Sequence, residues 1–185
     1  MKTHPVYGKH PSESTIEQLS NHHILNHLGP CSSWFFVSTK PEEKHLGYDA
    51  SLQGHKALVI QYKSFISGKI SIDATQLTTL TTNFPKRKTP YAFYGFSLLP
   101  NYQAIADLYT QYIGCCGFSQ SMVFIDIHDM PATISNFNPV VYPSIKKYDL
   151  FNLVHLFKSC KVGIRNEELE VDSIKSDLTN NDEQQ

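Results

Sequence analysis

A strand that looks buried at its start ends in polar side chains. The segment "ALVIQYK", residues 57–63, runs from apolar residues into Gln61 and Lys63, which share one strand face because side chains alternate. An aspartate, Asp49, lies in the preceding segment "HLGYDASL". A short glycine-containing link joins the two segments, which predicts an antiparallel hairpin with Asp49 at about the depth of Gln61.

A carboxylate, an amide oxygen and an ammonium at one sheet edge suit phosphodiester hydrolysis. Mg²⁺ takes oxygen ligands in octahedral geometry, and Mn²⁺ accepts the same ligands. Asp49, Gln61 and the backbone carbonyl of Tyr62 would hold the metal, which lowers the pKa of bound water. Lys63 would orient the attacking water or balance charge on the phosphate.

One more carboxylate would complete such a site. The segment 12–29 is predicted to form a helix, because its apolar residues recur at helical spacing and Gly29-Pro30 ends it. This helix carries Glu17, which we take as the fourth site residue. Glu13, one turn earlier, is the alternative.

Other polar groups have simpler interpretations. Glu42 and Glu43 are predicted in a loop between strands. Three histidines gather on the first helix, but no H-E-x-x-H glutamate accompanies them, so we interpret them as core or surface residues: His22, His23 and His27. Asp126 and His128 are predicted to be polar groups at a strand end.

A basic loop precedes one of the predicted strands. Lys86, Arg87 and Lys88 form the densest basic cluster of the sequence. A solvated loop is the simpler interpretation, and contact with a nucleic-acid backbone is the functional one, because phosphate contacts supply most non-specific affinity.

The elements that must position these residues follow a helix–strand–strand–strand–helix–strand order. After the first helix, strands are predicted at 32–40, 45–52 and 56–64, a helix at 71–84 that Asp73 caps, and a strand at 91–99. A helix at 101–116, a strand at 121–130, a short strand at 140–144 and a helix at 148–159 follow. A sheet that is apolar on both faces needs cover on both, which predicts a layered α/β domain.

Composition and charge set the limits of this interpretation. The 185 residues are 41% hydrophobic, and no apolar run reaches the roughly 20 residues of a membrane span. No secretory signal and no C-x-x-C spacing are present, so we expect a cytoplasmic protein. Residues 1–165 are predicted to form one domain with 15 basic and 10 acidic residues, and residues 166–185 an acidic, disordered tail.

The sequence resembles the PD-(D/E)xK, or restriction-endonuclease-like, nuclease superfamily. The resemblance consists of a helix with a glutamate, the strands that carry "GYD" and "VIQYK", and the helix and strand that follow. The resemblance covers about residues 12–100. It implies an αβββαβ core with a mixed sheet, and the roles of metal ligand and water-positioning group for Asp49, Gln61, Lys63 and Glu17. The departures are Tyr48 where the family has proline, and glutamine at position 61 in place of an acid.

The expected function is therefore a Mg²⁺- or Mn²⁺-dependent nuclease that cuts DNA, in a restriction or defence setting, with RNA left open. Neither a helix-turn-helix nor a zinc finger is evident, so sequence readout would need a partner or would be slight, and a homodimer or a partner protein could supply the targeting. The alternative is a nuclease-fold protein with a lapsed site that acts as a binding or scaffold module. A plain α/β interaction domain is the third possibility.

Overall fold

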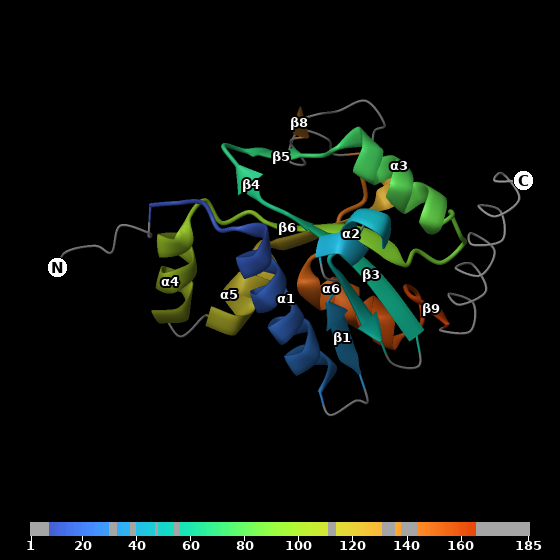
Figure 1. The fold of residues 1–185 in the computed structure, drawn as a ribbon. Helices are drawn as coiled ribbons and strands as arrows, with labels where there is room; N and C mark the ends of the chain where they lie inside the picture. The colour runs from blue at the N-terminus through green and yellow to red at the C-terminus, as the bar shows by residue number, and fades with distance from the viewer. Residues whose placement is uncertain are drawn as a thin grey trace, which may run out of the picture.

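The computed structural model describes residues 8–29, 33–37, 40–46, 48–53, 56–110, 114–130, 136–137 and 144–165. Helices are interspersed with single strands and with runs of strands along this part of the chain (Figure 1). They are α1 (Glu13–Leu28), β1 (Trp34–Val37), α2 (Lys40–Leu46), β2 (Ala50–Gln53), β3 (Lys56–Lys63), β4 (Phe65–Ile66), β5 (Lys69–Ser71), α3 (Ala74–Asn83), β6 (Ala92–Ser97), α4 (Tyr102–Thr110), α5 (Gly114–Ser121), β7 (Met122–Asp126), the 3₁₀ helix η1 (Ile127–Asp129), β8 (Asn136–Phe137), α6 (Leu150–Lys158) and β9 (Ile164–Arg165).

The central sheet is mixed. Its strands follow the order β1-β2-β3-β6-β7, and β9 pairs with the start of β3. β3 and β6 are parallel, whereas the other pairs of this sheet are antiparallel. A smaller sheet of β4, β5 and β8 stands apart from it. The predicted α/β class, with a mixed sheet between helices, is confirmed.

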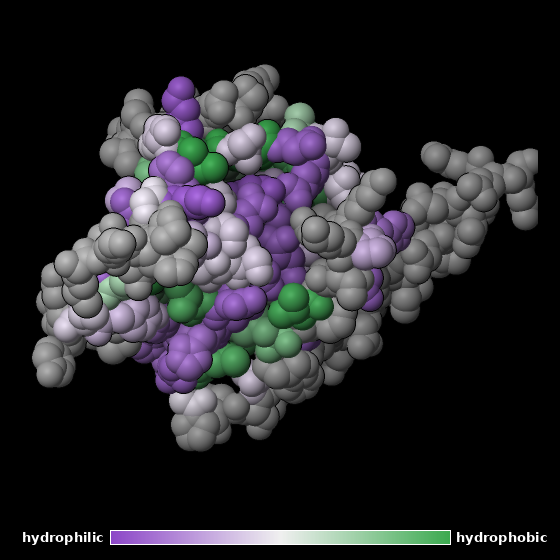
Figure 2. Space-filling view, turned by 60° about the vertical axis from the view of Figure 1, so that its left-hand side comes forward, coloured by the Kyte–Doolittle hydropathy of each residue, from purple (hydrophilic) through white to green (hydrophobic). Residues whose placement is uncertain are grey.

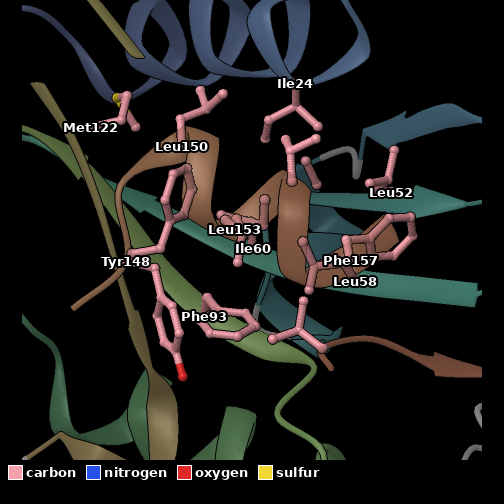
Figure 3. Close-up of a cluster of buried hydrophobic side chains, with 14 of the residues drawn as sticks. Ile24, Leu52, Leu58, Ile60, Phe93, Met122, Tyr148, Leu150, Leu153 and Phe157 are labelled. Atoms are coloured by element: carbon pink, nitrogen blue, oxygen red, sulfur yellow. The ribbon is translucent and has the colours of Figure 1, made fainter. Parts of the chain in front are cut away.

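Helices cover both faces of the central sheet, as alternation along β3 requires. Ile60 and other side chains on its face of the sheet belong to one cluster with Ile24 of α1, Phe118 of α5 and Leu153 of α6. Figure 3 shows α1 and α6 packed over this cluster. Val59 faces the other way, toward a second cluster that α3 closes. This cover on both faces explains why β3 is apolar on both sides until Gln61.

Side-chain caps fix where the helices begin. Ser12 Oγ accepts from the Thr15 amide at 3.1 Å at the start of α1, and Asp73 Oδ1 accepts from the Thr75 amide at 2.7 Å at the start of α3. Asn101 Oδ1 accepts from the Ala104 amide at 2.9 Å beside α4. The predicted helix at 12–29 and the predicted cap at Asp73 are both confirmed.

Several short elements differ from the predicted ones. The predicted loop with Glu42 and Glu43 is wrong, because both lie on α2, and β2 is correspondingly shorter than the predicted strand 45–52. The predicted helix 101–116 is two helices, α4 and α5, and the β4–β5 hairpin was not predicted. Position 54 of the predicted link, most of the predicted strand 140–144 and the acidic segment 166–185 lie outside the described residues.

None of the helices in the described part of the chain has the length and apolar character needed to cross a bilayer.

Candidate functional site

Asp49 and Gln61 meet at the point where the β2–β3 hairpin opens. Ala50 pairs with Ile60, and the Asp49 amide donates to the Ile60 carbonyl at 3.2 Å, so Asp49 lies directly opposite Gln61, just before β2. Gln61 Nε2 donates to Asp49 Oδ2 at 2.7 Å, and the Tyr62 amide donates to the same oxygen at 2.5 Å. The predicted depth of Asp49 is confirmed by this register.

The amide oxygen of Gln61 is the least satisfied polar atom of this pair. Gln61 is fully buried, and its Oε1 has no hydrogen-bond partner among the residues that the structure describes. The amide orientation follows from its neighbours, because Nε2 also donates to the Tyr62 carbonyl at 3.3 Å, and Oε1 in its place would face two acceptors. A buried unsatisfied acceptor costs about 1–3 kcal/mol, so a ligand that it could bind would offset this cost.

Lys63 ends β3 on the same face as Gln61. Only 9% of the residue is exposed, and its Nζ lies 3.8 Å from Glu13 Oε1. The Ser64 amide also donates to Glu13 Oε1, at 3.4 Å. Glu13 therefore comes from α1 to the carboxyl end of β3.

Glu17, the predicted fourth site residue, lies near a different group. Its charge, together with that of Asp49, adds to burial in raising the pKa of the Tyr62 hydroxyl. The Tyr62 side chain points to the α1 face of the sheet, where its hydroxyl donates to Asn21 Oδ1 at 2.7 Å. Glu17 thus acts on the Tyr62 hydroxyl through its charge, and Glu13 lies within ion-pair distance of Lys63.

Two further residues that the sequence interpretation did not include border the site. Tyr94 pairs with Gln61 across the parallel β3–β6 ladder, and its hydroxyl is buried with no partner among the described residues. Burial raises the pKa of Tyr94, and the charges of Asp73 and Asp49 raise it further. The Tyr94 hydroxyl therefore lies near two carboxylates.

Asp73 connects the site to the start of α3. Its pKa lies below the usual value because the Thr75 and Gln76 amides donate to it, with a smaller contribution from the charge of Lys63. The register between β3 and β6 brings Tyr94 to Gln61, and the charge of Asp73 acts on Tyr94 and on Lys63. We define the candidate site as Glu13, Asp49, Gln61, Lys63, Asp73 and Tyr94.

Hydrophilic residues form a band across the face that is turned forward in Figure 2, between two hydrophobic patches.

The atoms of the candidate site that could bind a metal are oxygen atoms, which suits a hard cation. Asp49 supplies a carboxylate, and Gln61 supplies an amide oxygen that is buried and unsatisfied. Within the described ranges, no three His, Cys, Asp or Glu side chains are grouped so that they could hold a metal. Mg²⁺ usually keeps several waters and takes one or two carboxylates from the protein, so Asp49 and Gln61 fit this ion.

The basic loop lies at the other end of the sheet. β6 starts beside Val59, so the residues before it lie toward the start of β3, away from Lys63. Arg87 and Lys88 border a pocket together with Lys56, the first residue of β3. Lys86 is exposed in the same loop. The trio of Lys86, Arg87 and Lys88 is therefore not adjacent to Asp49 and Lys63.

The remaining polar candidates have structural roles. Asp126 Oδ1 accepts from the His128 amide at 2.9 Å and caps η1, while His128 Nε2 lies 2.9 Å from the Phe84 carbonyl oxygen. Burial raises the pKa of the Asp126 carboxyl. Both residues are satisfied by local contacts, as their interpretation as strand-end polar groups predicts.

Two histidines of α1, His23 and His27, are part of the packing of α1 against α4 and α5. His23 Nε2 lies 2.5 Å from the Tyr109 hydroxyl, and its ring stacks on Phe118 with centroids 5.0 Å apart. His27 Nε2 lies 3.2 Å from Ser119 Oγ. Burial, together with smaller contributions from the neighbouring His22 and His27, lowers the pKa of His23 to about 4. The core interpretation holds for His23, which is buried.

We predict that His23 makes the fold less stable in acid. Its pKa is about 4 when folded and 6.5 when unfolded, so the unfolded chain binds more protons between these values and stability falls as pH drops from 6.5 toward 4. The contribution is about 2 kcal/mol. Denaturant unfolding at several pH values should show that the free energy of unfolding of His23→Phe rises relative to that of the wild type as pH drops from 6.5 toward 4. A variant at an exposed, uncharged position of the same helix, Gln18→Ala, should keep the wild-type slope, and equal slopes for all three proteins would contradict the assignment.

No family model, no curated protein and no solved structure matches the chain.

Proposed function

We propose that the protein is a metal-dependent nuclease whose reacting groups lie at the carboxyl end of β3. The observation that carries the proposal is the buried Gln61 amide, whose Nε2 donates to the Asp49 carboxylate and whose Oε1 has no partner among the described residues. An amide oxygen and a carboxylate are ligands for Mg²⁺ or Mn²⁺. The order α1, β1, β2, β3, α3, β6 also agrees with the αβββαβ core that the resemblance implies, with α2 and the β4–β5 hairpin as insertions.

The residues divide the chemistry between them. Asp49 and Gln61 would hold the divalent cation, which when bound lowers the pKa of a water molecule and polarises the phosphoryl oxygen. Lys63 lies on the same strand face, where its ammonium can orient that water and offset charge on the phosphate. We take Glu13 as the first-helix acid because its Oε1 lies 3.8 Å from Lys63 Nζ.

Asp73 and Tyr94 extend the proposed site beyond the motif. Asp73 adds a second carboxylate whose pKa responds to Lys63, so it helps to keep the ammonium in place. The Tyr94 hydroxyl, buried and adjacent to Gln61 in the ladder, is a hydrogen-bond donor that a substrate or a water molecule could use.

Cleavage assays test this proposal. Supercoiled plasmid, single-stranded DNA and RNA are incubated with purified protein in Mg²⁺, in Mn²⁺ and in excess chelator. We expect cleavage with a divalent cation and none with chelator, in the wild type but not in Asp49→Asn. Asparagine preserves the acceptor for the Tyr62 amide, so the variant separates loss of charge from loss of fold.

A second function, a binding module with a lapsed site, is favoured by a different observation. Asp49 already accepts from Gln61 and Tyr62, and Glu13 lies within ion-pair distance of Lys63, so several site groups are satisfied within the protein. On this alternative, nucleic acid would bind to the protein without being cut. Gel-shift binding with intact substrate in Mg²⁺ and Mn²⁺ would favour the module over the nuclease.

A further inference from the structure

A basic pocket lies at the opposite end of β3 from the candidate site. Its volume is about 390 Å³, within the range of about 300–1,000 Å³ that is usual for small-molecule sites. Four of its lining residues are cationic and none is acidic: Lys56, Arg87, Lys88 and Arg165, with Thr89, Cys160, Gly163 and Ile164 completing the wall. An anion is the ligand that such a lining favours.

The β-pairing at this pocket sets two positive residues against each other. Lys56 of β3 and Arg165 of β9 are direct partners in the antiparallel register. Like charges directly opposite one another destabilise a strand pair, by the same order as favourable cross-strand pairs stabilise it. A bound anion between the two side chains would reverse the sign of this contribution.

Contacts outside the pocket hold part of the wall in place. Lys56 Nζ donates to the Phe157 carbonyl and lies 4.5 Å from the centroid of the Phe157 ring. The Arg87 guanidinium carbon lies 6.0 Å from the centroid of the Tyr91 ring. Cations that are already positioned lose less conformational entropy when a ligand binds.

The two loops that form the wall are joined by their backbones. The Gly163 amide donates to the Pro90 carbonyl at 2.8 Å and links the segment after α6 to the basic loop before β6. Gly163 has a φ of +91°, and an added Cβ would lie 3.0 Å from the Phe157 ring and 3.2 Å from the Ala57 carbonyl. A side chain at this position would therefore be strained, and the hydrogen bond between Gly163 and Pro90 holds the two loops of the pocket together.

We propose that this pocket binds a phosphate group. Arginine and lysine side chains are the usual partners of phosphate, and a phosphate dianion would lie between Lys56 and Arg165 with Arg87 and Lys88 in reach. Lys56 and Lys63 are separated by seven residues of one strand, about 23 Å at 3.3 Å per residue. The pocket is thus separate from the candidate site, and the phosphate proposal does not depend on whether the candidate site cleaves nucleic acid.

Phosphate binding is tested in chelator, so that no divalent cation contributes. The full-length wild type is titrated with inorganic phosphate, with a nucleoside monophosphate, and with oligonucleotides that carry a 5′-phosphate or a 5′-hydroxyl, and binding is followed by calorimetry and by thermal unfolding. The two variants are Arg165→Gln in the pocket and Lys69→Gln, an exposed cation on β5. Phosphate also stabilises proteins by exclusion from their surfaces, so the difference between wild type and variants is the quantity that matters.

The expected result has two parts with opposite signs. Without phosphate, Arg165→Gln should unfold about 1–3 °C higher than the wild type, because a like-charge pair is removed. With phosphate, the same variant should bind at least about tenfold more weakly, since it loses a charge-assisted contact, while Lys69→Gln follows the wild type. Preference for the 5′-phosphate oligonucleotide would identify a nucleic-acid end as the source of the phosphate, and equal binding of the monophosphate would identify a free nucleotide.

Three outcomes would overturn the proposal. The first is wild-type affinity for phosphate in Arg165→Gln. The second is no saturable binding of any phosphate compound by the wild type. The third concerns the seven acidic residues of segment 166–185, which follows Arg165 directly. If phosphate binds only after these acids are replaced by amides, the protein's own carboxylates are the ligand and the phosphate proposal fails.

Discussion

Replacing Lys63 by alanine should lower the rate of metal-dependent cleavage by about 100- to 1,000-fold while metal binding persists. Lys63 is nearly buried, at 9% exposure, on the face that carries Gln61, and its charge reaches Asp73. Removing it takes away the group proposed to orient water and to offset charge on the phosphate. The metal ligands, Asp49 and Gln61, stay in place.

Stability should change little in the same variant. The partner of Lys63 in the ion pair, Glu13, is half-exposed, and such pairs contribute at most about 1 kcal/mol. Cleavage of plasmid DNA is measured beside unfolding temperature for wild type, Lys63→Ala and Lys158→Ala. Lys158 is exposed at the end of α6, so its variant should cut as fast as the wild type. If Lys63→Ala cleaves DNA as fast as the wild type, Lys63 has no role in the proposed reaction.

Replacing Gln61 by glutamate should destabilise the metal-free protein and strengthen its response to metal. In the wild type, Gln61 Nε2 donates to Asp49 Oδ2 at 2.7 Å. Glutamate would place a second carboxylate against the first in a buried setting, and losing a hydrogen bond to a charged group costs about 1.5–3 kcal/mol. The unfolding temperature should therefore fall by about 5 °C or more for a chain of this length.

The pH dependence of this variant follows from the same pair. Two carboxylates in contact share a proton, which raises the pKa of the introduced group in the folded state above its unfolded value. The folded protein then gains stability as pH falls below that raised pKa, so the penalty should shrink in mild acid. This direction is opposite to the one expected for His23, which destabilises the fold in acid.

Metal addition and a neutral variant complete the Gln61 experiment. Mn²⁺ should raise the unfolding temperature of Gln61→Glu by more than that of the wild type, because an added carboxylate is a stronger ligand than an amide. The methionine side chain of Gln61→Met has a similar shape but no oxygen. This variant should lose the hydrogen bond, and Mn²⁺ should not raise its unfolding temperature by more than that of the wild type. Equal metal-induced shifts in the glutamate and methionine variants would contradict the assignment of Gln61 as a ligand.

The sequence predicts the hairpin geometry well because the rule behind it is local. Alternation along residues 57–63 places Gln61 and Lys63 on one face, and a short link pairs this strand with the preceding one. The observed register, with Ala50 opposite Ile60, follows directly from that pairing. Asp73 as a helix cap is local in the same way, since it depends on the three residues that follow it.

The short elements were missed because each is close to the minimum length for its type. α2 has seven residues, and its signal is Pro41 followed by two glutamates in the first turn, which is typical of a helix start. The β4–β5 hairpin turns at Ser67 and Gly68, both with positive φ, which is the geometry of a two-residue hairpin turn. The strands on either side of this Ser-Gly pair have only two and three residues, which is too short for the alternation of apolar and polar residues to indicate a strand.

The contacts that depend on distant parts of the chain are the ones that no single sequence reveals. Tyr94 meets Gln61 only because β3 and β6 run parallel in one register after the α3 crossover. The choice between Glu13 and Glu17 depends on where α1 lies along its own axis relative to the end of β3, since the two are about one helical turn apart on the same helix face. The basic pocket likewise needs β9, a two-residue strand that pairs with the start of β3.

Titration of Mn²⁺ into the wild type and into Asp49→Asn, followed by calorimetry, tests most directly whether Asp49 and Gln61 hold a divalent cation. The account predicts one saturable site in the wild type and its loss in Asp49→Asn, with both proteins equally folded because the Tyr62 amide keeps its acceptor. Identical Mn²⁺ binding by the two proteins, or no binding by the wild type, would contradict it.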